Sequence, residues 1–223
     1  MVITFSGLDG SGKSTQIAKL AEWLRMRGID HRIVETHGGT LYATVGRFIK
    51  RCSPSRSQSL LNEHYDLHRN SWRRRFLGRL RSVFFWLDVG IFSVWVKLLL
   101  DRRNRVIICD RSLVDEAVQL AYLGFCCVKG FTRRLKVCPS VTQAFFLSVP
   151  PEMAYARNPE YPIEHFRKKE SFYELCRQTS ALVAIPPGTP EDVHECIIGH
   201  VMALIEKGSD DPCCVSFHEP PAQ

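Results

Sequence analysis

Short apolar runs recur along this chain, and longer stretches with a mixed apolar and polar pattern separate them. Runs that are rich in β-branched and aromatic side chains predict β-strands. Five runs fit this description: VITF (2–5), HRIV (31–34), VIIC (106–109), AFFLSV (144–149) and LVAI (182–185). Those of the last three runs that are nearly unbroken in apolar residues are typical of strands covered on both faces, as in a parallel sheet.

Between these runs the apolar residues follow a helical period. Ile17, Leu20, Ala21 and Leu24 recur at helical spacing before Gly28, a stop signal, and predict a helix over 14–27. Further helices are expected at about 40–51, across 57–100, and at 113–136, 151–158, 166–181 and 190–206. Strands that alternate with helices predict a doubly wound α/β fold, with a five-stranded parallel sheet, helices on both faces and right-handed crossovers.

No internal repeat or linker interrupts this alternation, so we expect one domain over residues 1–207. A chain of 223 residues is large enough to bury a full core without disulfides or metal. The last stretch, GSDDPCCVSFHEPPAQ (208–223), has no periodicity and contains three prolines. It predicts a disordered tail.

One apolar segment, VFFWLDVGIFSVWVKLLL (83–100), approaches the length of a membrane span and follows six arginines between Arg69 and Arg81. Asp88, Gly90 and Lys97 interrupt it. A spanning helix would also separate VIIC from the first strand by a bilayer, although both are expected in one sheet. We therefore favour a helix in the core or in a dimer interface, with a peripheral membrane contact as the second interpretation.

Composition and charge limit the classes of partner. Hydrophobic residues make up 45% of the chain and charged residues 24%, which is typical of a globular protein. The net charge of +7 favours a polyanionic partner: nucleotide phosphates, nucleic acid or an anionic membrane surface. The nine cysteines include no CxxC pair, so no zinc site is indicated, and a reducing cytoplasm fits best. No leader precedes VITF, so we expect neither a secretory signal nor a transit peptide.

The most informative motif is FSGLDGSGKSTQ (5–16), which matches GxxxxGK[ST] between a predicted strand and a predicted helix. Glycines let successive backbone amides surround one phosphate chain, and the start of the helix adds partial positive charge. The Lys13 amine would neutralise the β- and γ-phosphates, and the Ser14 hydroxyl would bind Mg²⁺. The alternative is a glycine-rich turn that carries a lysine. The motif predicts a nucleoside triphosphate site formed by Gly7, Leu8, Asp9, Gly10, Ser11, Gly12, Lys13, Ser14 and Thr15.

A second element, VIICDRS (106–112), ends a predicted strand on Asp110 and Arg111. An acidic residue there would help to hold Mg²⁺, although Asp also favours helix N-caps and surface turns. Arg111 would face the crevice at the carboxyl ends of the strands, where ligands of such sheets bind.

A third element is a basic cluster after Pro159 and Pro162, formed by Arg167, Lys168 and Lys169. It predicts a short lid that closes over phosphates. The alternative is a solvated helix face.

Together these elements resemble the thymidylate kinases, a family of P-loop nucleoside monophosphate kinases, over about the first 205 residues. GLDGSGKSTQ is close to the family's phosphate loop, ETHGGT (35–40) is similar to its EPGGT element, and CDRS (109–112) to its DR motif. The resemblance implies a P-loop NTPase fold, transfer of the γ-phosphoryl group of ATP with Mg²⁺, dTMP as the acceptor, and a homodimer. In that mechanism Arg111 would hold the acceptor phosphate, Asp9 would orient the acceptor sugar or the metal shell, and Lys13 and Arg167 would stabilise the transferred group.

The resemblance also implies an acceptor pocket. Tyr65 and Arg69 match an aromatic residue that stacks on the base and an arginine four positions later. AYLG (121–124) resembles the family's AYQG, in which the tyrosine disfavours a 2′-hydroxyl, so Tyr122 would take that role with Gln119 one turn before it. The alternative for Tyr65, Gln119 and Tyr122 is ordinary helix packing.

The family has two branches. In one branch an arginine inside the phosphate loop meets the phosphates, whereas in the other a glycine stands there and the lid supplies the charge. Gly10 and the cluster around Arg167 match the second branch.

The sequence departs from the family mainly on the acceptor side. No arginine precedes ETHGGT, Leu123 replaces the glutamine of AYQG, the spacing from Asp110 to Tyr122 is about three residues longer, and 83–100 is long. Two alternatives therefore remain open: a P-loop kinase for another small acceptor, and a nucleotide-binding regulator without turnover. A nucleic-acid binder that uses the arginines of 69–81 is not favoured, because aromatic and basic residues there are not arranged as in any known module.

Overall fold

The computed structural model describes residues 1–35, 106–122, 141–179 and 182–209, and single positions at 83, 87, 89–91, 94 and 98. The helix expected at 40–51, most of 57–100, the second half of 113–136 and the tail from 210 lie outside the described residues. The described elements are β1 (Val2–Ser6), α1 (Lys13–Met26), β2 (His31–Glu35), β3 (Val106–Asp110), α5 (Leu113–Tyr122), β4 (Gln143–Leu147), α7 (Pro151–Arg157), α8 (Ile163–Thr179), β5 (Leu182–Ile185) and α9 (Pro190–Ser209).

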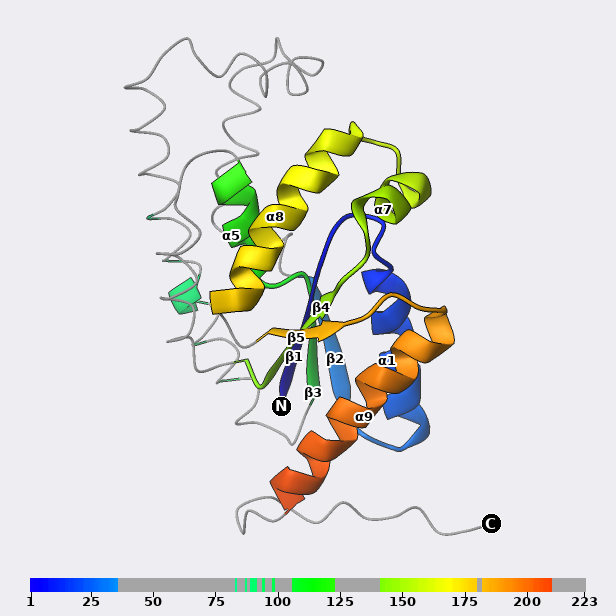
Figure 1. Ribbon diagram of the computed structural model, residues 1–223. Helices are drawn as coiled ribbons and strands as arrows, with labels where there is room; N and C mark the ends of the chain where they lie inside the picture. The colour runs from blue at the N-terminus through cyan, green and yellow to red at the C-terminus, as the bar shows by residue number, and fades with distance from the viewer. Residues whose placement is uncertain are drawn as a thin grey trace, which may run out of the picture.

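The five strands form one all-parallel sheet in the order β2-β3-β1-β4-β5 (Figure 1). β1 lies in the centre, with Phe5 paired to Asp110 of β3 and to Phe145 of β4. The carboxyl ends of β1, β3 and β4 therefore meet at one edge of the sheet. The predicted five-stranded parallel sheet is confirmed, and its order is consistent with a P-loop NTPase fold.

Helices cover both faces of the sheet, as predicted (Figure 1). On one face, α1 and α9 pack over a core that includes Phe5, Leu20 and Ile197, each with no exposed surface. On the other face, α5, α7 and α8 enclose a second core with Phe166 and Tyr173. Strands buried on both faces explain the unbroken apolar runs of the sequence.

Local hydrogen bonds determine where α9 begins. At α9, the Thr189 hydroxyl accepts a bond from the Asp192 amide at 3.2 Å, and the Asp192 carboxylate accepts one from the Thr189 amide at 3.1 Å. This reciprocal capping box and Pro190 at the first helical position begin the helix.

Several predicted boundaries shift, and three of the shifts are of two or three residues. The fourth strand ends at Leu147 instead of 149, because the chain turns toward Pro150, where the Val149 amide bonds to the Leu147 carbonyl. α8 begins at Ile163, directly after Pro162, and not at 166. α9 continues to Ser209, beyond the expected end at 206.

The described positions of 83–98 present an apolar face to solvent. Val83, Leu87, Ile91, Val94 and Leu98 are each at least half exposed, whereas Val89 is buried. These five side chains therefore lie outside the two cores that the described residues form. Within the described residues, no helix combines the length and apolar character that crossing a membrane requires. The homodimer, the peripheral membrane contact and the cytoplasmic location stay predictions.

Candidate functional site

The glycine-rich loop connects β1 to α1 at the carboxyl edge of the sheet. Gly7, Gly10 and Gly12 have φ angles of 149°, 84° and 91°, which residues other than glycine rarely adopt. The Ser11 amide bonds to the Leu8 carbonyl at 3.1 Å and closes the turn. Ser14 and Thr15 are exposed at the first turn of α1, where the helix dipole favours an anion. The loop has the local geometry of a phosphate cradle.

Gly10 lies against the backbone of α7. A Cβ atom at this position would be 2.6 Å from the Ala154 carbonyl oxygen, closer than real Cβ contacts come. A larger side chain such as arginine therefore has no room here. This packing supports the predicted match to the family branch that has glycine in the loop.

We expect Gly10→Ala to destabilise the protein by roughly 1–3 kcal/mol more than Gly28→Ala, and to weaken ATP binding. Both glycines have positive φ (84° and 67°), so both substitutions strain the backbone, but a Cβ at Gly28 meets no atom within 4 Å. The difference in the free energy of unfolding, measured in urea, isolates the contact with Ala154. Equal losses for the two variants would mean that α7 does not constrain the loop.

Lys13 is buried beneath the loop and bonded to it. Its Nζ atom donates to the Gly7 carbonyl at 2.8 Å, the Leu8 carbonyl at 2.7 Å and the Ser11 hydroxyl at 3.4 Å. Burial lowers the pKa of Lys13 below its usual value, and the carboxylates of Asp115, Asp9 and Asp110 oppose that shift. The ammonium group stands where it can turn from loop carbonyls to phosphate oxygens.

A small charged pocket of about 30 Å³ lies on one side of the loop and is lined by Gly7, Leu8, Asp9, Arg111, Asp115, Gln119, Lys169 and Tyr173. The Asp9 carboxylate bridges two cations across it: Arg111 at 3.3 Å and Lys169 at 3.5 Å. Burial would raise the pKa of Asp9, but Lys169, Arg111 and Lys13 outweigh burial and lower it. The structure thus brings together Asp9, Arg111 and Gln119 from three predicted motifs.

The three basic residues at the start of α8 point to three different partners. Arg167 bonds to the exposed Glu152 of α7 at 3.0 and 3.2 Å. The Lys168 ammonium lies 5.0 Å from the centre of the Tyr122 ring. Lys169 has a side chain only 13% exposed and reaches Asp9 in the loop. In this conformation Lys169, and not Arg167, is the member of the cluster that contacts the loop.

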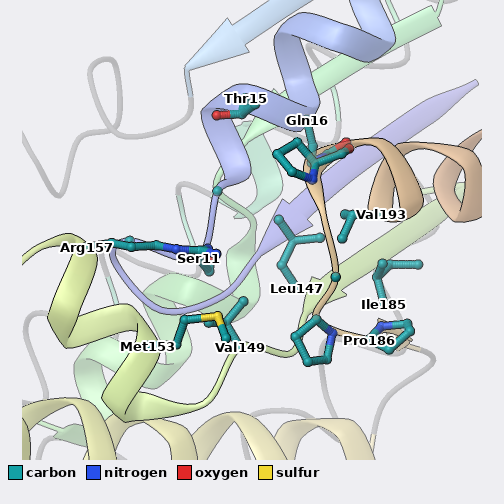
Figure 2. A pocket seen from close by; sticks show the side chains of 15 residues that line it. Ser11, Thr15, Gln16, Leu147, Val149, Met153, Arg157, Ile185, Pro186 and Val193 are labelled. Carbon is teal, nitrogen blue, oxygen red and sulfur yellow. The ribbon is translucent and has the colours of Figure 1, made fainter.

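A larger cavity of about 300 Å³ lies on the other side of the loop. Figure 2 shows side chains from α1 (Thr15, Gln16), α7 (Met153, Arg157) and the β5 region (Ile185, Pro186) around a common space. Gly10, Ser11 and Gly12 of the loop also line it. The walls are mainly apolar, with the Arg157 guanidinium near the loop, so the cavity suits a flat, partly apolar group attached to an anion. From the sequence alone, Arg157 could be identified only as a basic residue near the end of a predicted helix.

The predicted metal ligands lie on neighbouring elements. Asp110 ends β3 beside β1, and its charge acts on Lys13; Ser14 is in the first turn of α1. No cluster of three or more His, Cys, Asp or Glu side chains suitable for a metal occurs among the described residues. Mg²⁺ bound to nucleotide phosphates needs only one or two protein oxygens and keeps several waters, so a hydroxyl and a carboxylate fit it.

The predicted acceptor residues are only partly described. Tyr65 and Arg69 lie outside the described residues. Gln119 lines the charged pocket, but Tyr122 is not among the residues that line it. The Tyr122 hydroxyl is 2.9 Å from His165 Nδ1, and the His165 ring stacks on Tyr161. Tyr122 packs against α8, and its role toward a 2′-hydroxyl stays a prediction.

Several curated proteins that are similar to the chain are named thymidylate kinase. The chain is 28% identical over 151 residues to the one from Desulfotalea psychrophila, an alignment that covers 68% of the chain and 64% of that relative. It is 24% identical over 229 residues to the one from Kosmotoga olearia, with 93% of the chain and 98% of the relative covered. It is 28% identical over 222 residues to the one from Carboxydothermus hydrogenoformans, with 91% and 97% covered. No family model matches the sequence.

Proposed function

Because the chain is a distant homologue of the thymidylate kinases, we propose that it transfers the γ-phosphoryl group of ATP to the phosphate of a nucleoside monophosphate. One observation carries the proposal: the phosphate loop lies between two pockets of different chemistry. Gly10 to Gly12 line the larger, mainly apolar cavity, and Gly7 to Asp9 line the charged pocket. A donor in the larger cavity and the phosphate of an acceptor at the charged pocket would meet at the loop.

The donor side suits ATP. The adenosine would enter the cavity next to Met153 and Arg157, and the triphosphate would follow the loop amides toward Lys13. Mg²⁺, held by Ser14 and through water by Asp110, would neutralise charge on the β- and γ-phosphates. Lys13 would add a fixed positive charge where charge develops on the transferred group.

The acceptor side suits a phosphate monoester. Arg111 and Lys169 now share the Asp9 carboxylate, and an acceptor phosphate would replace Asp9 as the partner of Arg111. The second pKa of a phosphate monoester is near ~6, so its attacking oxygen is largely deprotonated at neutral pH. The acceptor needs no strong general base, and catalysis depends on positioning and charge neutralisation.

We further propose dTMP as the acceptor, with ATP and Mg²⁺ as the other reactants. The proposal draws on the resemblance in the loop and in the DR motif. Because the sequence departs from the family on the acceptor side, two other hypotheses remain: a kinase for a different small acceptor, and a nucleotide-binding regulator that does not catalyse phosphotransfer.

A panel of acceptors tests the proposal. Purified protein is mixed with Mg²⁺-ATP and each of dTMP, dUMP, UMP, CMP, AMP and GMP, and the release of ADP is measured. We expect rapid ADP release with dTMP and little without an acceptor. Turnover only with another monophosphate would keep the kinase and replace its acceptor. Bound ATP without turnover on any acceptor would favour the regulator, and failure to bind ATP would refute the proposal.

A further inference from the structure

A buried carboxylate, Asp115, joins three parts of the site. Its Oδ2 atom accepts a bond from the Ser112 amide at 2.7 Å, and Oδ1 accepts one from the Gly7 amide at 3.2 Å. The Ser112 hydroxyl accepts a bond from the Val114 amide at 3.0 Å, so Ser112 and Asp115 together cap the start of α5. One side chain thus begins a helix and fixes the first glycine of the phosphate loop.

Tyr173 brings α8 to the same point. Its hydroxyl is 2.6 Å from Asp115 Oδ1 and 3.1 Å from the Gly7 carbonyl oxygen. Its ring is buried and stacks on Phe146 of β4, with ring centres 5.2 Å apart. Burial and the Asp115 charge raise the pKa of Tyr173, so the hydroxyl keeps its proton. That single proton has two acceptors within reach.

The Gly7 carbonyl also accepts a bond from Lys13. An ammonium group has three N–H donors, and those of Lys13 face the Gly7 carbonyl, the Leu8 carbonyl and the Ser11 hydroxyl. Lys13 must therefore release at least one loop atom when it turns to phosphate. Leaving a buried carbonyl without a hydrogen-bond donor costs free energy, unless another donor replaces the one that is lost.

We propose that Tyr173 and Asp115 are positioning residues that release Lys13 toward phosphate. When Lys13 leaves the Gly7 carbonyl, the Tyr173 hydroxyl turns its proton from Asp115 to that carbonyl. Asp115 keeps the bonds from the Gly7 and Ser112 amides, so each buried group retains a partner. Only hydrogen bonds are exchanged: no covalent bond forms or breaks, and the proton stays on the Tyr173 oxygen. This inference rests on the proposed ATP site.

The test is Tyr173→Phe, which removes the hydroxyl and keeps the ring on Phe146. We expect the affinity for ATP to fall about tenfold, because a buried carbonyl loses its second donor in the ATP-bound state. The affinity for adenosine, which has no phosphates, is expected to change less than about twofold. Both are measured by competition against a fluorescent ATP analogue. Tyr155→Phe on α7 is the matched control, because Tyr155 is 38% exposed, its ring packs on Phe166, and it lines neither pocket at the loop.

The ratio of the two affinities separates this role from a structural one. If the hydroxyl only stabilises the fold, ATP and adenosine lose affinity by the same factor in Tyr173→Phe, and the inference is wrong. An unchanged ATP affinity refutes it as well. If the wild-type protein fails to bind ATP, the proposed function itself fails. That outcome is distinct from either result for the variant.

Discussion

Lys13→Met is expected to lower phosphotransfer by at least ~10³-fold while the protein stays folded. The substitution keeps most of the apolar stem and removes a fixed charge from a buried site next to the loop carbonyls. Loss of one preorganised donor in such a site costs roughly 10²–10³ in rate, and loss of a full charge costs more. Turnover is measured as ADP release, and folding by circular dichroism and thermal denaturation.

Lys19→Met is the matched control for Lys13. Lys19 is on the same helix and pairs with Glu191 at 2.7 Å, but its side chain is 32% exposed and that of Glu191 is 70% exposed. Exposed pairs of this kind contribute about 0–1 kcal/mol, so activity and stability should change little. Rapid ADP release by a correctly folded Lys13→Met variant would refute the proposed role of Lys13 in phosphotransfer.

The strands, the first helix and the phosphate loop could be predicted because local signals determine them. β1 and β3 are apolar runs buried on both faces, and the loop needs glycine wherever φ is positive. Asp110 and Arg111 follow a strand that neighbours β1, so a parallel sheet alone brings them near the loop. Each of these inferences needs only the period of the pattern and the direction of the strands.

The direction of side chains on α8 could not be predicted in the same way. Arg167, Lys168 and Lys169 are consecutive, so a helix turns them to three different sides, and only its docking decides which one reaches Asp9. Lys169 and Tyr173 are four positions apart and share the side that faces the loop. Once Lys169 is placed, Tyr173 follows from helical spacing, but the sequence alone cannot place the first of them.

Long-range hydrogen bonds account for the rest. In the sequence Asp115 is one acidic residue in the first turn of a predicted helix, where it would serve as a capping residue. Its bond to Gly7 joins positions 108 residues apart and depends on the strand order. Gln119, and not Tyr122, lines the charged pocket for a similar reason, since the direction in which α5 leaves β3 decides which turn of the helix meets the loop.

The second large effect is expected at Arg111, whose backbone is strained. Its φ of 69° makes it the one non-glycine residue with positive φ among the described positions. Such a conformation costs about 1–2 kcal/mol relative to a right-handed one. Strain of this kind clusters at functional sites. The positive φ of Arg111 therefore supports the proposed role of its guanidinium group at the end of β3.

We expect Arg111→Ala and Arg111→Gly to lower kcat/KM for the acceptor equally, by about 10²–10³-fold, because either one removes two charge-assisted hydrogen bonds to phosphate. The affinity for ATP should change less than about threefold. The two variants should differ in stability instead. The free energy of unfolding is expected to be about 1 kcal/mol larger for the glycine variant than for the alanine variant, because glycine relieves the backbone strain.

Urea denaturation measures the difference in stability, and initial rates at varied acceptor concentration measure the loss of activity. Arg177→Ala is the control, since Arg177 pairs with Glu174 on the exposed side of α8. If ATP binding and acceptor use fell by the same factor, Arg111 would serve the loop as a whole and not the acceptor phosphate. If the alanine and glycine variants were equally stable, the strain at position 111 would depend on the arginine side chain, because the backbone would relax once that side chain is removed.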